Sequence, residues 1–539
     1  MDWQLLQEKI NSVKASNKSL LYNTMLYWSQ KPFNITNILI ENLSSEGDII
    51  FDPFMGSGVT LLEATNHKLN RRAIGVDIND MPIFLCKNSV TIPTEKTYKI
   101  IDDIKTELSN HNYIYDTNCV ECGNQHARIS KIIYDIEPEL IIKEIHYSCN
   151  CSSKKHIKNA TTTDYNNFIH KYNIKHISDL PLIANSRIAV KDGETISDKF
   201  SKRSFYALDI IKGLIMSIEE PDTKNILWYI YASIIHKTKI LDIKLSSQWP
   251  LWIPKKNCVE RNVFEIFINN IDKYIKSREY VSMLYNADFV DNYQDLTIGK
   301  SLIIKKGIQN ISEAEIPSSC VDLIITDPPY LGQVPYSEYM QLYRPFLDNK
   351  INFEDEIVIT NAKNREKSYS EYFSLMKIAF KNISRILKPN GYICLYFHDS
   401  DLKVWYHLIE TFENAGLSFE TCMHINKSQK TLKKILDPKK TMSGETLLFL
   451  TKKAVTTKSR KFTNSDLEKI QLIAEDIIKH SLYGYATTSQ LYDNGILNFI
   501  IEEGILFDLS EKYKDLTDIF SQILIYNSDK GVWEINKSK

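Results

Sequence analysis

The feature that most constrains the fold is a short apolar run followed at once by an acid and a glycine-rich turn. Residues 48–58 read DIIFDPFMGSG, and the next segment, VTLLEATNHK, has helical spacing of its apolar residues. Gly56 and Gly58 lack the Cβ atoms that would keep a ligand away from the backbone, so this strand, loop and helix unit is typical of sites for nucleotide-like ligands. Taken alone, the same residues could form an ordinary tight turn.

The spacing of residues around this turn restricts the class of ligand that the site could bind. A dinucleotide-binding turn would have a third glycine where this chain has Leu61, and no Lys-Ser or Lys-Thr pair follows to hold a triphosphate. Asp77 ends a second expected strand nineteen residues after Gly58, the spacing at which a carboxylate accepts hydrogen bonds from ribose hydroxyls. The expected ligand is therefore an adenosine without phosphates.

A second strand-end acid lies far downstream, in VDLIITDPPY at residues 321–330. The proline rings fix the backbone around Asp327, so its carboxylate and the carbonyl of Pro328 would be aimed rigidly at a hydrogen-bond donor. The exocyclic amine of a base is such a donor, and Tyr330 supplies a ring on which a flipped base could stack. A turn that ends a strand, with Tyr330 in the core, is the structural alternative.

Together, DPFMGSG, GVDI and TDPPY resemble the motifs of the amino-methyltransferases that use S-adenosylmethionine to methylate an exocyclic base nitrogen in DNA. The stretch YNTMLYWSQKP at 22–32 is similar to the segment that these enzymes place beneath the methionine part of the cofactor. The resemblance implies that Asp77 holds the ribose, that Ile78 packs on the adenine ring and that Lys31 lies near the cofactor carboxylate. The residues implied around the methionine moiety are Asp52, Phe54, Gly56 and Gly58.

The resemblance also implies the reaction, with Asp327, Pro328, Pro329 and Tyr330 as the catalytic tetrad. The expected substrate is a flipped adenine in double-stranded DNA, because an aspartate opens the tetrad where cytosine-specific members more often have serine. An N4-cytosine DNA methyltransferase, an RNA base methyltransferase and a catalytically weak DNA-recognition subunit remain as alternatives. The last is suggested by SLIIKKGIQNIS, which has Ile308 where the family often has an acid against the cofactor adenine.

The segments after the tetrad alternate helix and strand, which predicts an α/β fold with a doubly wound, Rossmann-like methyltransferase sheet. Helices are expected over 370–387 and 402–416, strands over 392–397, 417–425 and 445–453, and a turn at KPNG, residues 388–391. The polar and aromatic stretch 331–370 would rim the pocket. His398 and Asp399 end a strand, and either approach to substrate or a structural role suits them.

The distance between the two motif groups predicts an insertion, since the sheet's own crossovers need far fewer residues. Expected domains are 1–100 and 296–454 for the two parts of the methyltransferase domain, with 101–295 inserted and 455–539 as a C-terminal helical domain ending in the strand GVWEI. The insertion would carry target recognition, and the C-terminal domain would serve in docking.

Four of the nine cysteines form an organised group in the insertion. Cys119 and Cys122, then Cys149 and Cys151, are close to the spacing of a zinc ribbon with two hairpin strands between the knuckles, although the second knuckle is one residue short. A structural zinc ion is expected, with four free thiols as the alternative. His126, His146 and His156 could each replace a ligand.

The bulk composition is that of an ordinary globular protein, 43% hydrophobic and 25% charged, with no apolar run long enough to span a membrane and no signal peptide pattern. These features predict a cytoplasmic protein. The net charge of −1 requires any DNA contact to come from local basic patches, such as those in SKRSFYAL, in SSQWPLWIPKK and in the lysines between 427 and 440. Double-stranded DNA is the expected partner, together with subunits of a restriction or defence system.

Overall fold

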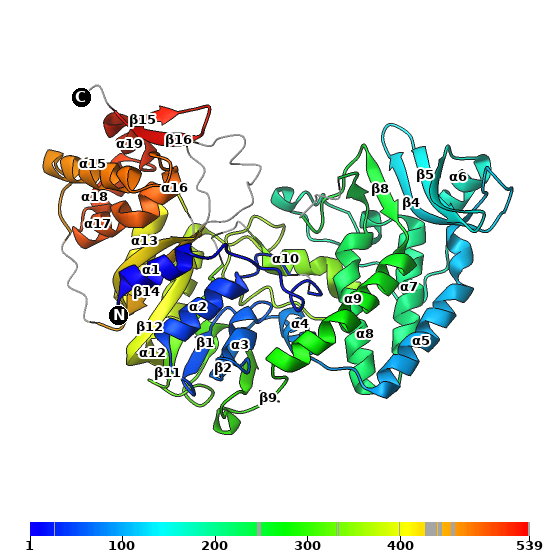
Figure 1. Cartoon of the computed structure of the whole chain (residues 1–539), viewed down its shortest axis with the longest axis horizontal. Helices are drawn as coiled ribbons and strands as arrows, with labels where there is room; N and C mark the ends of the chain where they lie inside the picture. The colour runs from blue at the N-terminus through cyan, green and yellow to red at the C-terminus, as the bar shows by residue number, and fades with distance from the viewer. Residues whose placement is uncertain are drawn as a thin grey trace.

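The computed structural model describes residues 1–25, 27–244, 249–329, 331, 334–397, 399–425, 439, 445–453 and 459–536. A large sheet built from both ends of the chain lies beside a smaller sheet built from the middle of it, and the C-terminal helices pack against the large sheet (Figure 1). Among the described residues, no helix is both long and apolar enough to cross a membrane.

The large sheet has eight described strands in the order β13-β14-β12-β11-β1-β2-β10-β9. Neighbours from β12 to β9 pair in parallel, whereas β14 is antiparallel to both β12 and β13. The expected α/β sheet with mainly parallel pairing is therefore present. The strands are β1 Ile49–Asp52, β2 Arg72–Asp77, β9 Phe289–Val290, β10 Ser301–Lys305, β11 Val321–Thr326, β12 Leu387–Phe397, β13 Ser418–Ile425 and β14 Glu445–Thr451.

Helices cover both faces of this sheet because its central strands are apolar on both sides. In β1, Ile50 packs into a cluster with helices on one face, while Ile49 and Phe51 pack into a second cluster with helices on the other. The first face carries α2 Phe33–Leu43, α3 Val59–Ala64 and α4 Asp80–Ser89, and the second carries α12 Tyr369–Ile386 and α13 Leu402–Asn414. The carboxyl ends of the parallel strands therefore meet along one edge of a fully covered sheet.

The turn predicted at residues 388–391 is wrong, because β12 runs without interruption through it. The ladder with β11 jumps instead: Val321 pairs with Leu387, and Leu323 pairs with Tyr392. The extra residues of β12 thus bulge from the sheet rather than reverse the chain. A Cβ at Gly391 would lie 2.8 Å from the carbonyl oxygen of Asp322, so the close approach of the two strands explains this glycine.

The middle of the chain forms a second sheet in the order β6-β5-β4-β8-β7, with β3 paired to β4. Its strands are β3 Asp116–Thr117, β4 Ala127–Asp135, β5 Ile141–Cys149, β6 Ser152–Lys158, β7 Leu241–Asp242 and β8 Cys258–Arg261. Its helices are α5 Glu95–Asn110, α6 Thr162–Ile169, α7 Lys202–Met216, α8 Pro221–Thr238 and α9 Val263–Leu284. The two strands predicted between the cysteine pairs are confirmed as β4 and β5.

The C-terminal part is helical and ends in a hairpin. Its elements are α15 Asn464–Lys479, α16 Thr488–Leu491, α17 Leu497–Glu502, α18 Leu506–Lys512, α19 Thr517–Ile523, β15 Leu524–Asn527 and β16 Val532–Ile535. The expected last strand is β16, and its partner β15 was not foreseen. Buried Asp493 accepts hydrogen bonds from His424 at 2.6 Å and from Thr446 at 2.7 Å, which ties these helices to β13 and β14.

Candidate active site

A pocket of about 780 Å³ opens where the carboxyl ends of β1, β2, β10 and β11 meet. In open parallel sheets this edge is the usual position of a ligand site. Seven residues predicted from sequence line the pocket: Lys31, Phe54, Gly56, Asp77, Ile78, Asp327 and Pro329. The structure thus brings together two groups of residues that are far apart in the chain.

Three other predicted residues lie beside the pocket rather than on its wall. Asp52 is fully buried, and neither Gly58 nor Pro328 lines the pocket. The prediction for Tyr330 falls outside the described residues, as does that for His398. Asp399 accepts a hydrogen bond from the backbone of Asp401 at 2.9 Å at the start of α13, and it does not line the pocket.

The two glycines of the turn serve different purposes. Gly56 has φ +51° and faces the pocket, and a Cβ there would lie 2.9 Å from the ring of Tyr27. Gly58 has φ +79°, and a Cβ there would lie 2.2 Å from the sulfur of Cys86 on α4. Gly56 therefore keeps space within the site, whereas Gly58 allows α3 and α4 to pack closely.

A buried ion pair supports the floor of the pocket. Lys31 Nζ lies 3.0 Å from Asp52 Oδ2, and the other carboxylate oxygen accepts from the hydroxyl of Thr326 at 2.8 Å. Asp52 thus joins β1, β11 and the segment before α2 in one network. Lys31 also donates to the carbonyl of Phe54 at 3.4 Å, so its ammonium group sits at the pocket wall.

Asp77 is held by the backbone at the end of β2. It accepts hydrogen bonds from the backbone N–H of Asn79 at 3.0 Å and of Gly56 at 3.2 Å. Burial nevertheless raises the pKa of Asp77 to about 7. A carboxylate so desolvated favours ligand hydroxyls that donate to it, since they replace the missing water.

Two tyrosines that sequence reasoning did not single out form part of the wall next to Asp327. Tyr27 and Tyr336 stack with ring centroids 6.0 Å apart and 14° between the ring planes. Burial, followed by the charge of Asp327, raises the pKa of Tyr336, so its hydroxyl stays protonated. Both residues belong to stretches predicted to lie near the pocket, 22–32 and 331–370, but side-chain direction could not be predicted from the pattern.

A polar network fixes the short helix that begins with Tyr336, α10 Tyr336–Met340. Arg365 donates to Glu338 at 2.8 Å and to Glu356 at 2.7 Å, and both carboxylates are buried. Asn185, from the middle of the chain, donates to Glu338 at 2.6 Å. Glu356 lines the pocket and accepts from the backbone N–H of Ser337 at 2.9 Å, so the network fixes one wall of the site and ties it to the middle region.

Comparisons with known proteins identify a family for this chain. A family model described as DNA methylase, for the N6 and N4 enzymes, matches residues 3–83 and 321–537, more than half of the chain. The chain belongs to this DNA methylase family. It is therefore a DNA amino-methyltransferase, as the motifs predicted, and the family includes enzymes for both adenine N6 and cytosine N4.

Curated relatives agree with the family. The chain is 24% identical to the type II methyltransferase M.MjaII of Methanocaldococcus jannaschii over 448 residues, which covers 77% of this chain and 78% of that protein. It is 24% identical to M.MvaI of Kocuria varians over 59% of this chain and 55% of that protein. Over 83 residues it is 46% identical to M.HindIII of Haemophilus influenzae, which covers 14% of this chain and 25% of that protein.

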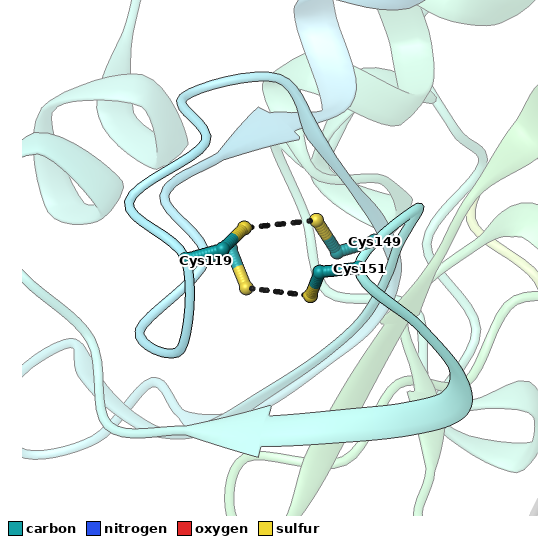
Figure 2. A group of neighbouring side chains, drawn as sticks. Cys119, Cys149 and Cys151 are labelled. Carbon is teal, nitrogen blue, oxygen red and sulfur yellow. Dashed lines mark hydrogen bonds between the residues drawn. The ribbon is translucent and has the colours of Figure 1, made fainter.

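The DNA methylase also brings its four organised cysteines together. Figure 2 shows Cys119, Cys149 and Cys151 with their sulfur atoms turned toward a common centre. The Sγ atoms of Cys119 and Cys151 are 3.7 Å apart, those of Cys122 and Cys149 are 3.6 Å apart, and all four lie within 4.8 Å of one another. Sulfurs at ~2.3 Å from a tetrahedral zinc ion would be about 3.8 Å apart, so the donor set fits that metal.

The three histidines considered as substitute zinc ligands each contact an acidic side chain. His126 contacts Asp116 at 2.7 Å, and His146 contacts Glu144 at 2.9 Å. His156 contacts Glu121 at 3.0 Å, and its ring lies near enough to Cys151 to form a second group with potential ligand atoms. The four cysteines are the simpler set, because each sulfur of the first pair lies next to a sulfur of the second pair.

Proposed function

We propose that this DNA methylase transfers the methyl group of S-adenosylmethionine to the exocyclic amine of an adenine flipped out of double-stranded DNA. One observation carries the proposal: Asp327, at the end of β11, faces the same pocket as the Gly56 turn and Asp77. A base amine next to Asp327 and a cofactor held by Asp77 would share one cavity.

The pocket suits this cofactor at several points. The space over Gly56, which a Cβ would reduce, admits a ligand close to the backbone, and Lys31 supplies a cation for a carboxylate. Asp77 would accept hydrogen bonds from ribose hydroxyls, while Ile78 and Phe54 add apolar surface. When bound, S-adenosylmethionine supplies a methyl group on a sulfonium, which is a good leaving group.

The pocket also offers a substitute for the acid missing at Ile308. Ile308 is buried and lines the pocket without a polar group, whereas the neighbouring Gln309 also lines it and donates from Nε2 to the carbonyl of Asp355 at 2.7 Å. With Nε2 used in this way, Oε1 is the amide atom able to accept a hydrogen bond from the cofactor's adenine amine. Gln309 would then take the place of the acid. This substitution argues against the alternative of a catalytically weak DNA-recognition subunit.

For the base, Asp327 and the carbonyl of Pro328 would accept hydrogen bonds from the amine, which localises its lone pair for attack. Catalysis would rest on positioning and on these acceptors, without a covalent intermediate. Tyr27 and Tyr336 are aromatic neighbours of Asp327 that would bound the base alongside Tyr330. Adenine is preferred over cytosine because an aspartate begins the tetrad, and N4-cytosine is the second candidate.

The proposed organisation follows the two sheets. Residues 1–100 and 296–454 would form a Rossmann-like methyltransferase domain, residues 101–295 an inserted zinc-ribbon-like and target-recognition region, and residues 455–539 a C-terminal domain. Cys119, Cys122, Cys149 and Cys151 would hold one structural zinc ion. Because the curated relatives are type II methyltransferases, a restriction partner is the defence-related role we propose.

The test is to incubate the purified chain with methyl-labelled S-adenosylmethionine and duplex DNA or RNA, and then to identify the nucleosides by mass spectrometry. Label on N6 of adenine in DNA is the expected result. Label on N4 of cytosine would select the second candidate, and label only in RNA would overturn the substrate. Cofactor binding without any product would favour the recognition-subunit alternative.

A further inference from the structure

A hollow in the middle region gathers positive charge away from the active site. The hollow, of about 1110 Å³, is lined by Lys237 at the end of α8, Arg261 at the end of β8, and Lys273 and Lys276 on α9. We call these four residues the basic hollow. Figure 1 shows α8 and α9 side by side, with β8 above them, in the region that the family model does not match.

The cations of the basic hollow are not paired with acids in the described part of the chain. Lys237 donates to the amide oxygen of Asn270 at 3.1 Å, a neutral partner. Asp272 is the acid on the wall, and Lys105 of α5 already contacts it at 3.1 Å. The other positive groups of the hollow make no ion pair within the described residues, so positive charge predominates in it.

Burial and neighbouring positive charges both act on Lys237. Desolvation, with the charges of Lys273 and Arg261, lowers the pKa of Lys237 to about 8. Desolvation also lowers the pKa of the Arg261 guanidinium, and Glu265 offsets only part of this effect. Like charges held together without an acid lower stability, and an anion in the hollow would relieve the repulsion.

The positive surface continues beyond the hollow onto the second sheet. Lys131 of β4 is directly opposite Arg261 of β8, so their side chains project from the same face of the sheet. The hollow is open, and its cations come from three different elements. This arrangement suits an extended polyanion better than a single enclosed phosphate.

We infer that the basic hollow binds the phosphate backbone of the duplex DNA that this methylase modifies. The inference rests on the proposed function, since it takes its polyanion to be the DNA substrate. Lys237, Lys273, Lys276 and Arg261 contact phosphates on one strand, outside the base pair being modified. The contacts add affinity and hold the middle region on the duplex, and they carry no sequence information themselves.

The test measures binding of the whole chain to a fluorescent duplex of about 30 base pairs across a salt series, with Lys237→Gln/Lys273→Gln as the variant. The matched control is Lys377→Gln/Lys381→Gln, which removes the same charge from two exposed lysines of α12. Arg261→Gln is a second variant. Calorimetry with S-adenosylhomocysteine shows whether each protein keeps its cofactor pocket.

The expected result is about a tenfold loss of affinity in the double variant, and a log–log salt slope shallower by about 1.8, at about 0.9 for each lost phosphate contact. The control should bind like the wild type. Equal binding by the double variant, or an equal loss in the control, would overturn the inference. So would tighter binding to a duplex RNA of the same length.

Failure of the proposed function is distinguishable from failure of this inference. If the wild type binds DNA through the basic hollow but methylates neither polymer, the inference stands and the proposed reaction is wrong. If it methylates DNA while the double variant retains full affinity and salt slope, the reaction stands and the inference is wrong.

Discussion

The two sheets of the molecule are held together in different ways. The large sheet is apolar on both faces and is covered by helices, and it also buries the ion pair of Lys31 with Asp52 beneath the pocket. The second sheet likewise buries an ion pair, Arg203 with Glu260 at 2.8 Å, but it also carries the four cysteines. The comparison teaches that both regions combine an apolar core with buried charge, whereas the middle region adds a cluster of sulfur groups.

The largest effect is expected at the reaction site. Asp327→Ala should lower the methylation rate by roughly a thousandfold, because it removes an acceptor that acts on the base amine, while S-adenosylhomocysteine affinity changes little. Single-turnover methylation and calorimetry measure the two quantities. Asp399→Asn, which alters a strand-end acid outside the pocket, is the control and should retain its activity. A normal rate for the Asp327 variant would remove this residue from the proposed mechanism.

The next effect concerns the sulfur cluster. Metal analysis should find close to one zinc per chain, and Cys119→Ser/Cys149→Ser should abolish it and open β4 to β6 to hydrogen exchange, because metal binding contributes folding free energy. The large sheet should keep its protection, since none of its described strands contributes a cysteine to the cluster. Cys320→Ser is the control. Protection of β4 to β6 that survives in the double variant would argue against a structural metal.

The buried ion pair gives the third test. Arg203→Met should destabilise the middle region by about 3–5 kcal/mol, because it leaves Glu260 buried without its partner. Arg203→Met/Glu260→Leu should regain most of that stability. Hydrogen exchange of α7 and β8 measures the stability of both variants. An equal loss in the single and double variants would mean that packing, rather than the unpaired charge, sets the cost.

Ligand binding in the pocket should depend on pH, and this effect should be intermediate in size. Since the pKa of Asp77 is about 7, the carboxylate that we propose accepts from ribose hydroxyls is lost as the pH falls through this value. S-adenosylhomocysteine affinity should then fall by about tenfold per pH unit below about 7, and Asp77→Asn should flatten the profile. A wild-type profile that is already flat would exclude Asp77 from ligand binding.

The Asp77 carboxyl also affects the stability of the ligand-free chain, and this effect depends on pH in the opposite direction. Its pKa is raised in the folded chain, so the folded state binds more protons than the unfolded state between about pH 4 and 7. The free energy of unfolding of the ligand-free chain should therefore decrease as the pH rises across this range. Denaturation of wild type and Asp77→Asn at several pH values compares the two slopes.

The smallest effect should come from Gln309. Gln309→Ala should weaken S-adenosylhomocysteine binding by about fivefold, equivalent to one hydrogen bond of about 1 kcal/mol. The analogue with hypoxanthine in place of adenine should bind the wild type more weakly, and the variant should no longer distinguish the two. Gln309→Glu keeps an acceptor and is the matched control. Equal discrimination by Gln309→Ala would show that another group contacts the base.

Much of the large sheet could be predicted from sequence, because its strands are short apolar runs that end in acids or glycines. Asp77 and Asp327 are close in the structure for this reason: both end parallel strands, and parallel strands end at the same edge. The position of the pocket followed from the same pattern.

The remaining parts depend on contacts that a local pattern does not contain. The stacked pair of Tyr27 and Tyr336 arises from two segments about 300 residues apart in the sequence, and the fork of Arg365 between Glu338 and Glu356 depends on the path of one loop. KPNG has turn residues, yet pairing with β11 keeps the chain extended there. In each case tertiary packing decided the outcome over local preference.

The chain leaves the large sheet after β2 and its helix α4, and it returns through β9 and β10, with β10 bonded directly to β2 from Ala73 opposite Ser301 to Asp77 opposite Lys305. The middle region therefore starts and finishes at neighbouring points of the same scaffold. A module joined in this way can be exchanged for one from a related enzyme without changing the strand order. Chimeras built at these two junctions would test whether the middle region sets the choice of DNA sequence.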